Sequence, residues 1–176
     1  MTYDSASLKT SVLWASLFTA LLWAIELGKQ HFGWPLAELG VIPQQWRGLA
    51  GIVAAPLIHG GWDHMVGNTL PLLLLGSLLL HGYPNSRWWT LAAIWLLSGL
   101  GVWCFGRDSS HFGASGLTHG IFFFLFFSGL LRRDKRSIAL LMIAFFMYGS
   151  MLLSIFPQQP DISYEYHFFG ALAGLL

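Results

Sequence analysis

Charged residues are scarce in this chain. Only 10% of its 176 residues are charged, and 55% are hydrophobic. A soluble domain carries about 25% charged residues, so the composition excludes a protein that faces water on all sides. The formal net charge of +1 gives no sign of a nucleic-acid partner.

Cysteine is nearly absent as well. Cys104 is the single cysteine, so the chain cannot form an internal disulfide. It lies in an apolar run, which predicts a buried thiol without a chemical role.

Long apolar runs are what the chain has instead. A helix needs roughly 20 apolar residues to cross about 30 Å of hydrocarbon. Five segments meet or approach this length: Leu8 to Gly28, Asp63 to His81, Trp88 to Phe105, Gly113 to Leu131 and Ser137 to Phe156. A sixth begins near Tyr164 and is still short at Leu176, so we expect a trimmed chain. Every span is predicted to be helical, because an open strand would leave backbone groups unsatisfied in lipid. The predicted fold class is all-α, a single six-span membrane domain over residues 1–176.

The connections between the spans predict an orientation. Six cations fall in the amino terminus and in the second and fourth connections: Lys9, Arg87, Arg132, Arg133, Lys135 and Arg136. The other connections hold Lys29, Arg47 and Arg107. Cytoplasmic loops are enriched in Lys and Arg, so both termini are predicted to be cytoplasmic. The long, aromatic first connection is predicted to lie in the outer interface.

Polar residues inside spans are costly and usually functional. They are His64 and Asn68 on the second span, Ser115 and His119 on the fourth, and His167 on the sixth. With a cytoplasmic amino terminus, all five fall toward the outer side of the membrane. Three separate helices therefore bring polar side chains to one region.

These residue types fit nucleophilic catalysis. A serine hydroxyl reacts once a base takes its proton, and an imidazole can do this at neutral pH. The tetrahedral intermediate also needs donors for its oxyanion, which His64, Asn68 and the Ser115 N–H could supply. The alternative for His64 and Asn68 is a structural hydrogen-bond pair between helices.

Small residues predict how the serine helix and the last helix meet. Gly116 and Gly120 are four apart on one span, and Gly170 and Gly174 are four apart on the other. This spacing lets helix backbones approach closely in lipid. Such a contact would bring His167 within hydrogen-bonding reach of the fourth span. Packing without function is the alternative interpretation.

The ordered series of motifs resembles the rhomboid intramembrane proteases. The matching pieces are Trp46-Arg47, His59, His64, Asn68, Gly113-Ala114-Ser115-Gly116, His167, Gly170 and Gly174, which cover nearly the whole chain. The resemblance implies a Ser115–His167 dyad, oxyanion stabilisation by His64 and Asn68, and no metal or organic cofactor. It also implies a structural or water-holding role for His59 and a structural role for Arg47.

One position departs from the family pattern. His119 stands where the family often has a tyrosine stacked on the catalytic histidine. At four residues from Ser115 it could itself touch the serine. We favour His167 as the base, because it lies nearer the outer surface from which water must come. His119 would then stack on it. Glu165 is two residues from His167 and is predicted to face another direction.

The predicted activity is cleavage of transmembrane protein substrates by a multi-pass protein of the bacterial inner membrane. One alternative is an inactive rhomboid-like protein that binds membrane helices without cutting them. A metal-binding or transport protein is suggested by seven histidines. However, no His-x₃-His pair recurs beside carboxylates as a metal site would prefer. The sequence leaves the oligomeric state open.

Overall fold

The computed structural model describes residues 7–157 and 162–176, and this part of the chain is helical. The α-helices are α1 (Leu8–Phe32), α2 (Gly51–Ala54), α3 (Trp62–Gly82), α4 (Arg87–Phe105), α5 (Ser115–Arg132), α6 (Lys135–Tyr148) and α7 (Tyr164–Gly174). Short 3₁₀ helices are η1 (Leu36–Leu39), η2 (Trp46–Leu49), η3 (Ala55–Leu57) and η4 (Gly149–Leu152). The predicted all-α class is confirmed.

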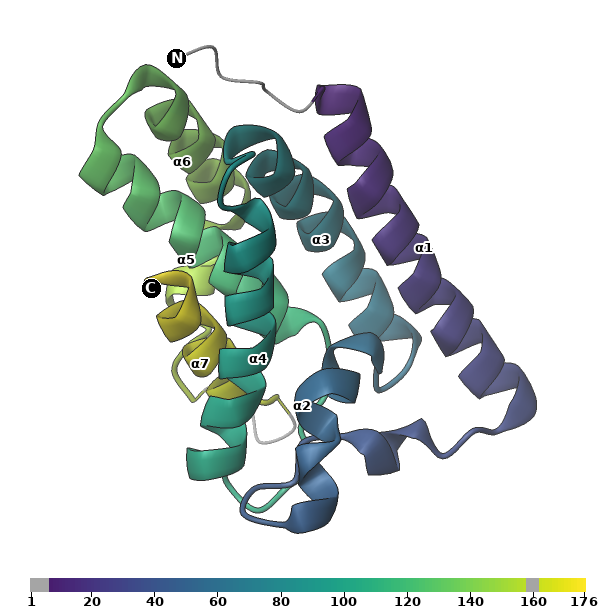
Figure 1. Ribbon diagram of the computed structural model, residues 1–176. Helices are drawn as coiled ribbons and strands as arrows, with labels where there is room; N and C mark the ends of the chain where they lie inside the picture. Colours follow the sequence, from purple (N-terminus) through teal and green to yellow (C-terminus); the bar gives the residue numbers. More distant parts are fainter. Residues whose placement is uncertain (1–6, 158–161) are drawn as a thin grey trace.

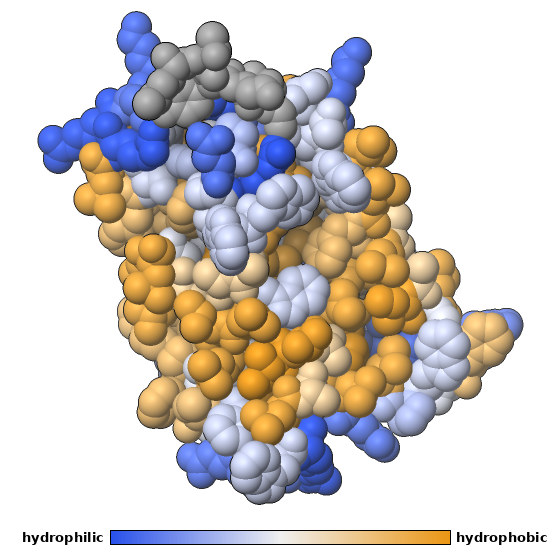
Figure 2. Space-filling model, viewed as in Figure 1, coloured by the Kyte–Doolittle hydropathy of each residue, from blue (hydrophilic) through white to orange (hydrophobic). Residues whose placement is uncertain are grey.

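Five helical segments are long and apolar enough to cross a membrane. They are α1, α3, α4, α5 and the continuous stretch Lys135–Leu152 that joins α6 to η4. The last helix, α7, has 11 residues and rises about 16 Å. An apolar belt covers the middle of the molecule, with polar side chains gathered above and below it (Figure 2). The chain is therefore a multi-pass membrane protein.

Two helix ends differ from the sequence prediction. The first span continues past Gly28 to Phe32, where Gly33 adopts the left-handed conformation and its N–H bonds to Lys29 O. This is a common way to end a helix, and it leaves Lys29 in the last helical turn rather than in the connection. The fifth span tightens into a 3₁₀ turn after Tyr148.

The α5 helix is the centre of the bundle, because α3, α4, α6 and α7 all pack against it. The α1 helix stands at one side and packs mainly on α3 (Figure 1). In the same view α3, α5 and α7 all begin in the lower part of the molecule and run upward. The amino ends of three helices thus lie on the same side.

The loops at this lower side are joined to one another. Val41 and His111 form an antiparallel bridge, with backbone hydrogen bonds of 2.8 and 2.9 Å. Trp103 Nε1 donates to Gln45 O at 3.0 Å, which fixes the loop before η2 to α4. Trp46 next to it remains 85% exposed. An outer-interface location of this connection remains a prediction.

Candidate active site

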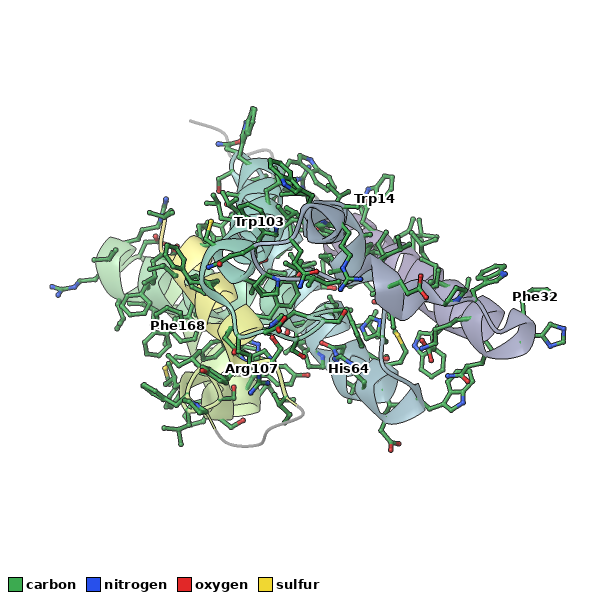
Figure 3. The ribbon with its side chains drawn as sticks, turned by 90° about the horizontal axis from the view of Figure 1, so that it is seen from below. Trp14, Phe32, His64, Trp103, Arg107 and Phe168 are labelled. Carbon is green, nitrogen blue, oxygen red and sulfur yellow. The ribbon has the colours of Figure 1, made fainter. Side chains whose placement is uncertain are left out.

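A cavity of about 710 Å³ lies where α3, α5 and α7 begin. Its polar lining includes Asp63, His64, Asn68, Ser110, Ser115, Thr118, His119, Ser163 and His167. Seen from below, His64 lies between α1 on one side and the group of α4 and α7 on the other (Figure 3). A second cavity of about 660 Å³, between α1 and α4, is lined by apolar side chains and offers no catalytic group. The five predicted polar residues therefore share the first cavity.

Ser115 is the first residue of α5, and the turn before it is held from two sides. Gly113 N–H donates to Ala55 O at 2.9 Å, and Ala114 N–H donates to His59 Nε2 at 3.4 Å. Gly113 has φ +122°, and a Cβ there would lie 2.6 Å from the His64 ring. Only glycine fits both the backbone conformation and this close approach. The turn thus fixes the start of α5, where the half-buried Ser115 lies, with Gly113 against the His64 ring.

Three hydrogen-bond donors belong to residues that line the same cavity. His64 Nδ1 accepts from Gly60 N–H at 3.2 Å, so Nε2 carries the proton of the neutral ring and is a donor. Asn68 Nδ2 donates to His64 O at 2.9 Å and retains a second N–H. The Ser115 N–H belongs to the first turn of α5, where backbone N–H groups lack helical partners. This Asn68 bond is made within α3 and joins no second helix.

His167 is oriented by the backbone of the segment after η4. Its Nδ1 lies 3.0 Å from Ser154 O. A carbonyl only accepts, so Nδ1 carries the proton and Nε2 presents a lone pair. Within residues 7–157 and 162–176, no hydrogen bond joins His167 to the Ser115 hydroxyl. The two side chains share the cavity, but the hydrogen bond expected from the glycine pattern is not formed.

His119 stacks on His167, with ring centroids 4.0 Å apart and planes 7° apart. Both His119 nitrogens are engaged: Nδ1 donates to Ser115 O at 2.7 Å, and Nε2 bonds with Ser154 Oγ at 2.7 Å. Neither nitrogen can accept the Ser115 proton without losing a bond already made. In the described residues His167 Nε2 has no hydrogen-bond partner, so His167 is the ring of the stacked pair whose lone pair is open.

The close approach of α5 and α7 through glycine is confirmed. A Cβ on Gly170 would lie 2.1 Å from Gly116 O, and one on Gly174 would lie 2.1 Å from Gly120 O. Real side-chain carbons do not approach backbone oxygen this closely. The four glycines therefore set the separation of the helices that carry Ser115 and His167.

A buried network behind the site was missed by sequence reasoning. Glu26 and Lys29 form an ion pair at 2.7 Å, and Lys29 Nζ donates to the carbonyl oxygen of His59. Burial, together with the nearby His64 and Lys29, lowers the pKa of His59 to about 3. The three-residue spacing of Glu26 and Lys29 is the signal in the sequence, but the sequence prediction places Lys29 in the first connection rather than in α1.

The loop after α4 holds the start of α7, a contact that sequence reasoning also missed. Arg107 pairs with Glu165 at 3.3 Å and donates to Ile162 O at 2.6 Å. His111 Nδ1 bonds with Ser163 Oγ at 2.6 Å, and this hydroxyl also caps α7 by accepting from the N–H of Tyr166. Glu165 contacts Arg107 and is 5% exposed. The local signal in the sequence is Ser163, which stands one residue before the predicted last helix and is a residue type that commonly caps a helix start.

Comparison with known proteins agrees with this architecture. Residues 43–176 match the rhomboid domain family. An uncharacterized protein of Mycobacterium tuberculosis is 39% identical over 168 residues, covering 90% of this chain and 70% of that protein. One of Mycobacterium leprae is 34% identical, covering 90% of this chain and 66% of that protein. No solved structure matches the chain. The chain therefore belongs to the rhomboid family, whose members are generally intramembrane proteases.

Proposed function

We propose that the protein is an intramembrane serine endopeptidase in which Ser115 is the nucleophile and His167 the general base. The observation that carries this proposal is the shared cavity. It holds a serine at a helix start, a histidine with its Nδ1 proton fixed, and donors from α3. Nε2 of His167 is the nitrogen with a lone pair for the serine proton.

The chemistry follows from these roles. Ser115 Oγ attacks the scissile carbonyl carbon while its proton moves to His167 Nε2, and the carbonyl electrons move to the oxygen. Donors from His64, Asn68 and the Ser115 N–H stabilise that oxyanion, each worth roughly 3 kcal/mol. The amine leaves with the proton from His167, and water activated by the same ring hydrolyses the acyl-enzyme. The Ser115 and His167 side chains must approach one another first, as catalytic hydrogen bonds often tighten only when substrate binds.

The proposed substrates are transmembrane segments of other proteins. A helical peptide bond is shielded by its own turn, so the segment must unwind beside the cavity before attack. The cation-rich ends of the helices support an inner-membrane location with cytoplasmic termini and a site open to the outer side. The whole chain, residues 1–176, would act as one domain in the lipid bilayer.

Cleavage of a panel of single-span substrates by purified protein tests the proposal. Wild type should cut at least one substrate and react with a fluorophosphonate probe, and Ser115→Ala should do neither. Product masses would give the depth of the cut. No product and no labelling by folded wild type would reject the proposal.

An inactive membrane-helix-binding protein is the second candidate. The observation that favours it is the missing hydrogen bond between Ser115 and His167 in the described residues. Such a protein would hold a single-span peptide in pull-down without labelling by the probe. The same labelling experiment therefore separates the two functions.

A further inference from the structure

Ser154 contacts both stacked imidazoles, although no sequence motif pointed to it. It lies half-buried in the turn that follows η4, at the end of the α6 segment. Its carbonyl oxygen accepts from His167 Nδ1 at 3.0 Å, and its hydroxyl bonds with His119 Nε2 at 2.7 Å. One residue therefore fixes two rings that come from two other helices.

The protons of this cluster follow from its acceptors. Ser115 O can only accept, so His119 Nδ1 carries a proton and Nε2 of the neutral ring has a lone pair. The Ser154 hydroxyl must then donate to His119 Nε2, which is nearer than its other acceptor, Met151 O at 3.2 Å. The two hydrogen bonds thus donate in the same direction: the Ser154 hydroxyl donates to His119, and His119 donates to the carbonyl of Ser115.

This direction matters when His167 gains a proton. A second cation on His119, stacked 4.0 Å away, would repel the new imidazolium. A donor bonded to Nε2 stabilises the neutral form of His119 and so directs the proton to His167. The bond from His167 Nδ1 to Ser154 O becomes charge-assisted at the same moment.

We infer that Ser154 is a positioning residue for the dyad, an inference that rests on the proposed function. Its main-chain carbonyl takes the place that an acidic side chain holds in a serine-histidine-aspartate triad, orienting the ring and facing the charge that forms. Its hydroxyl holds His119 in place and keeps it uncharged, so that His167 stacks on a neutral imidazole ring. No hydrogen bond joins Ser154 to Ser115 in the described residues, so Ser154 acts through the two rings.

Ser154→Ala tests the hydroxyl, because it removes that group and keeps the carbonyl. Losing one hydrogen bond should lower kcat by about five- to tenfold while KM for a single-span substrate stays unchanged. The matched control is Ser150→Ala in the same segment, whose side chain is exposed and should leave kcat at the wild-type value. Ser154→Thr restores a hydroxyl and should recover most of the activity.

A double-variant cycle separates positioning from general packing. His119→Phe keeps a stacked ring but removes both nitrogens, so adding Ser154→Ala to it should cause no further loss of kcat. Additive losses, or wild-type kcat in folded Ser154→Ala, would refute the role of Ser154 while cleavage by wild type upholds the protease. If Ser154→Ala does not fold, Ser154→Thr gives the test instead. A folded Ser154→Thr protein with a kcat as low as that of His119→Phe would refute the role of the Ser154 hydroxyl. Failure of the proposed function appears separately, as absence of cleavage and labelling in the wild type.

Discussion

Gly170→Ala should separate α5 from α7, the helices that carry Ser115 and His167. A Cβ at this position would lie 2.1 Å from the backbone oxygen of Gly116. Backbone atoms of a helix cannot rotate away as the end of a flexible side chain does. The added methyl group must therefore push α7 from α5 by about 1 Å or more, and His167 moves with α7.

The expected loss is large, because proton transfer depends on the separation of Ser115 and His167. A misplacement of about 1 Å can lower catalysis by about 100-fold. Overpacking should also lower the free energy of unfolding by about 1–3 kcal/mol. Gly76→Ala is the matched control: it also adds a methyl group inside a long helix, but there the new Cβ meets Ala15 at an ordinary 3.6 Å.

The assay compares kcat/KM for one single-span substrate, the rate of fluorophosphonate labelling and thermal unfolding, all in the same detergent. Gly170→Ala should be about 100-fold less active and slow to label, and Gly76→Ala should resemble wild type. A Gly170→Ala protein with wild-type labelling and cleavage would show that the glycine contact does not set the geometry of the dyad.

Three further outcomes follow from the contacts around the cavity. Arg107→Gln should lower the free energy of unfolding by about 1–3 kcal/mol, which is less than for a fully buried pair because Arg107 is part-exposed. Adding Glu165→Gln should restore part of the lost stability. If the double variant regains none, the Arg107–Glu165 pairing is contradicted. Burial lowers the pKa of His59 from 6.5 to about 3. The unfolded chain therefore protonates His59 more readily than the folded chain does. The contribution of the neutral His59 ring to the free energy of unfolding is fully present above pH 6.5 and should fall as the pH drops toward 3, by about 2 kcal/mol at pH 5. Unfolding curves of His59→Gln should lose this slope, and a wild-type curve that is flat over the same range would argue against the buried neutral ring. Finally, His167→Ala should abolish cleavage while His119→Tyr retains much of it, and the reverse pattern would make His119 the base.

The amino-acid sequence by itself predicted the features that depend on local composition. Apolar length identified the five spans, since crossing hydrocarbon is a property of each segment alone. Spacing of four residues placed His64 with Asn68, and Gly170 with Gly174, each pair on one helix face. The motif order from Trp46 to Gly174 predicted the family that the comparison then showed.

Tertiary structure alone decided which polar groups form hydrogen bonds and ion pairs between distant segments. The hydrogen bonds that fix the His119 and His167 rings depend on Ser154, which is distant in sequence and reaches both rings only because its turn folds over them. The same holds for the contact of Lys29 with the carbonyl of His59 and for the pairing of Arg107 with Glu165. A hydrogen bond is satisfied by any donor that packing brings within about 3 Å, so sequence pattern carries no record of these partners.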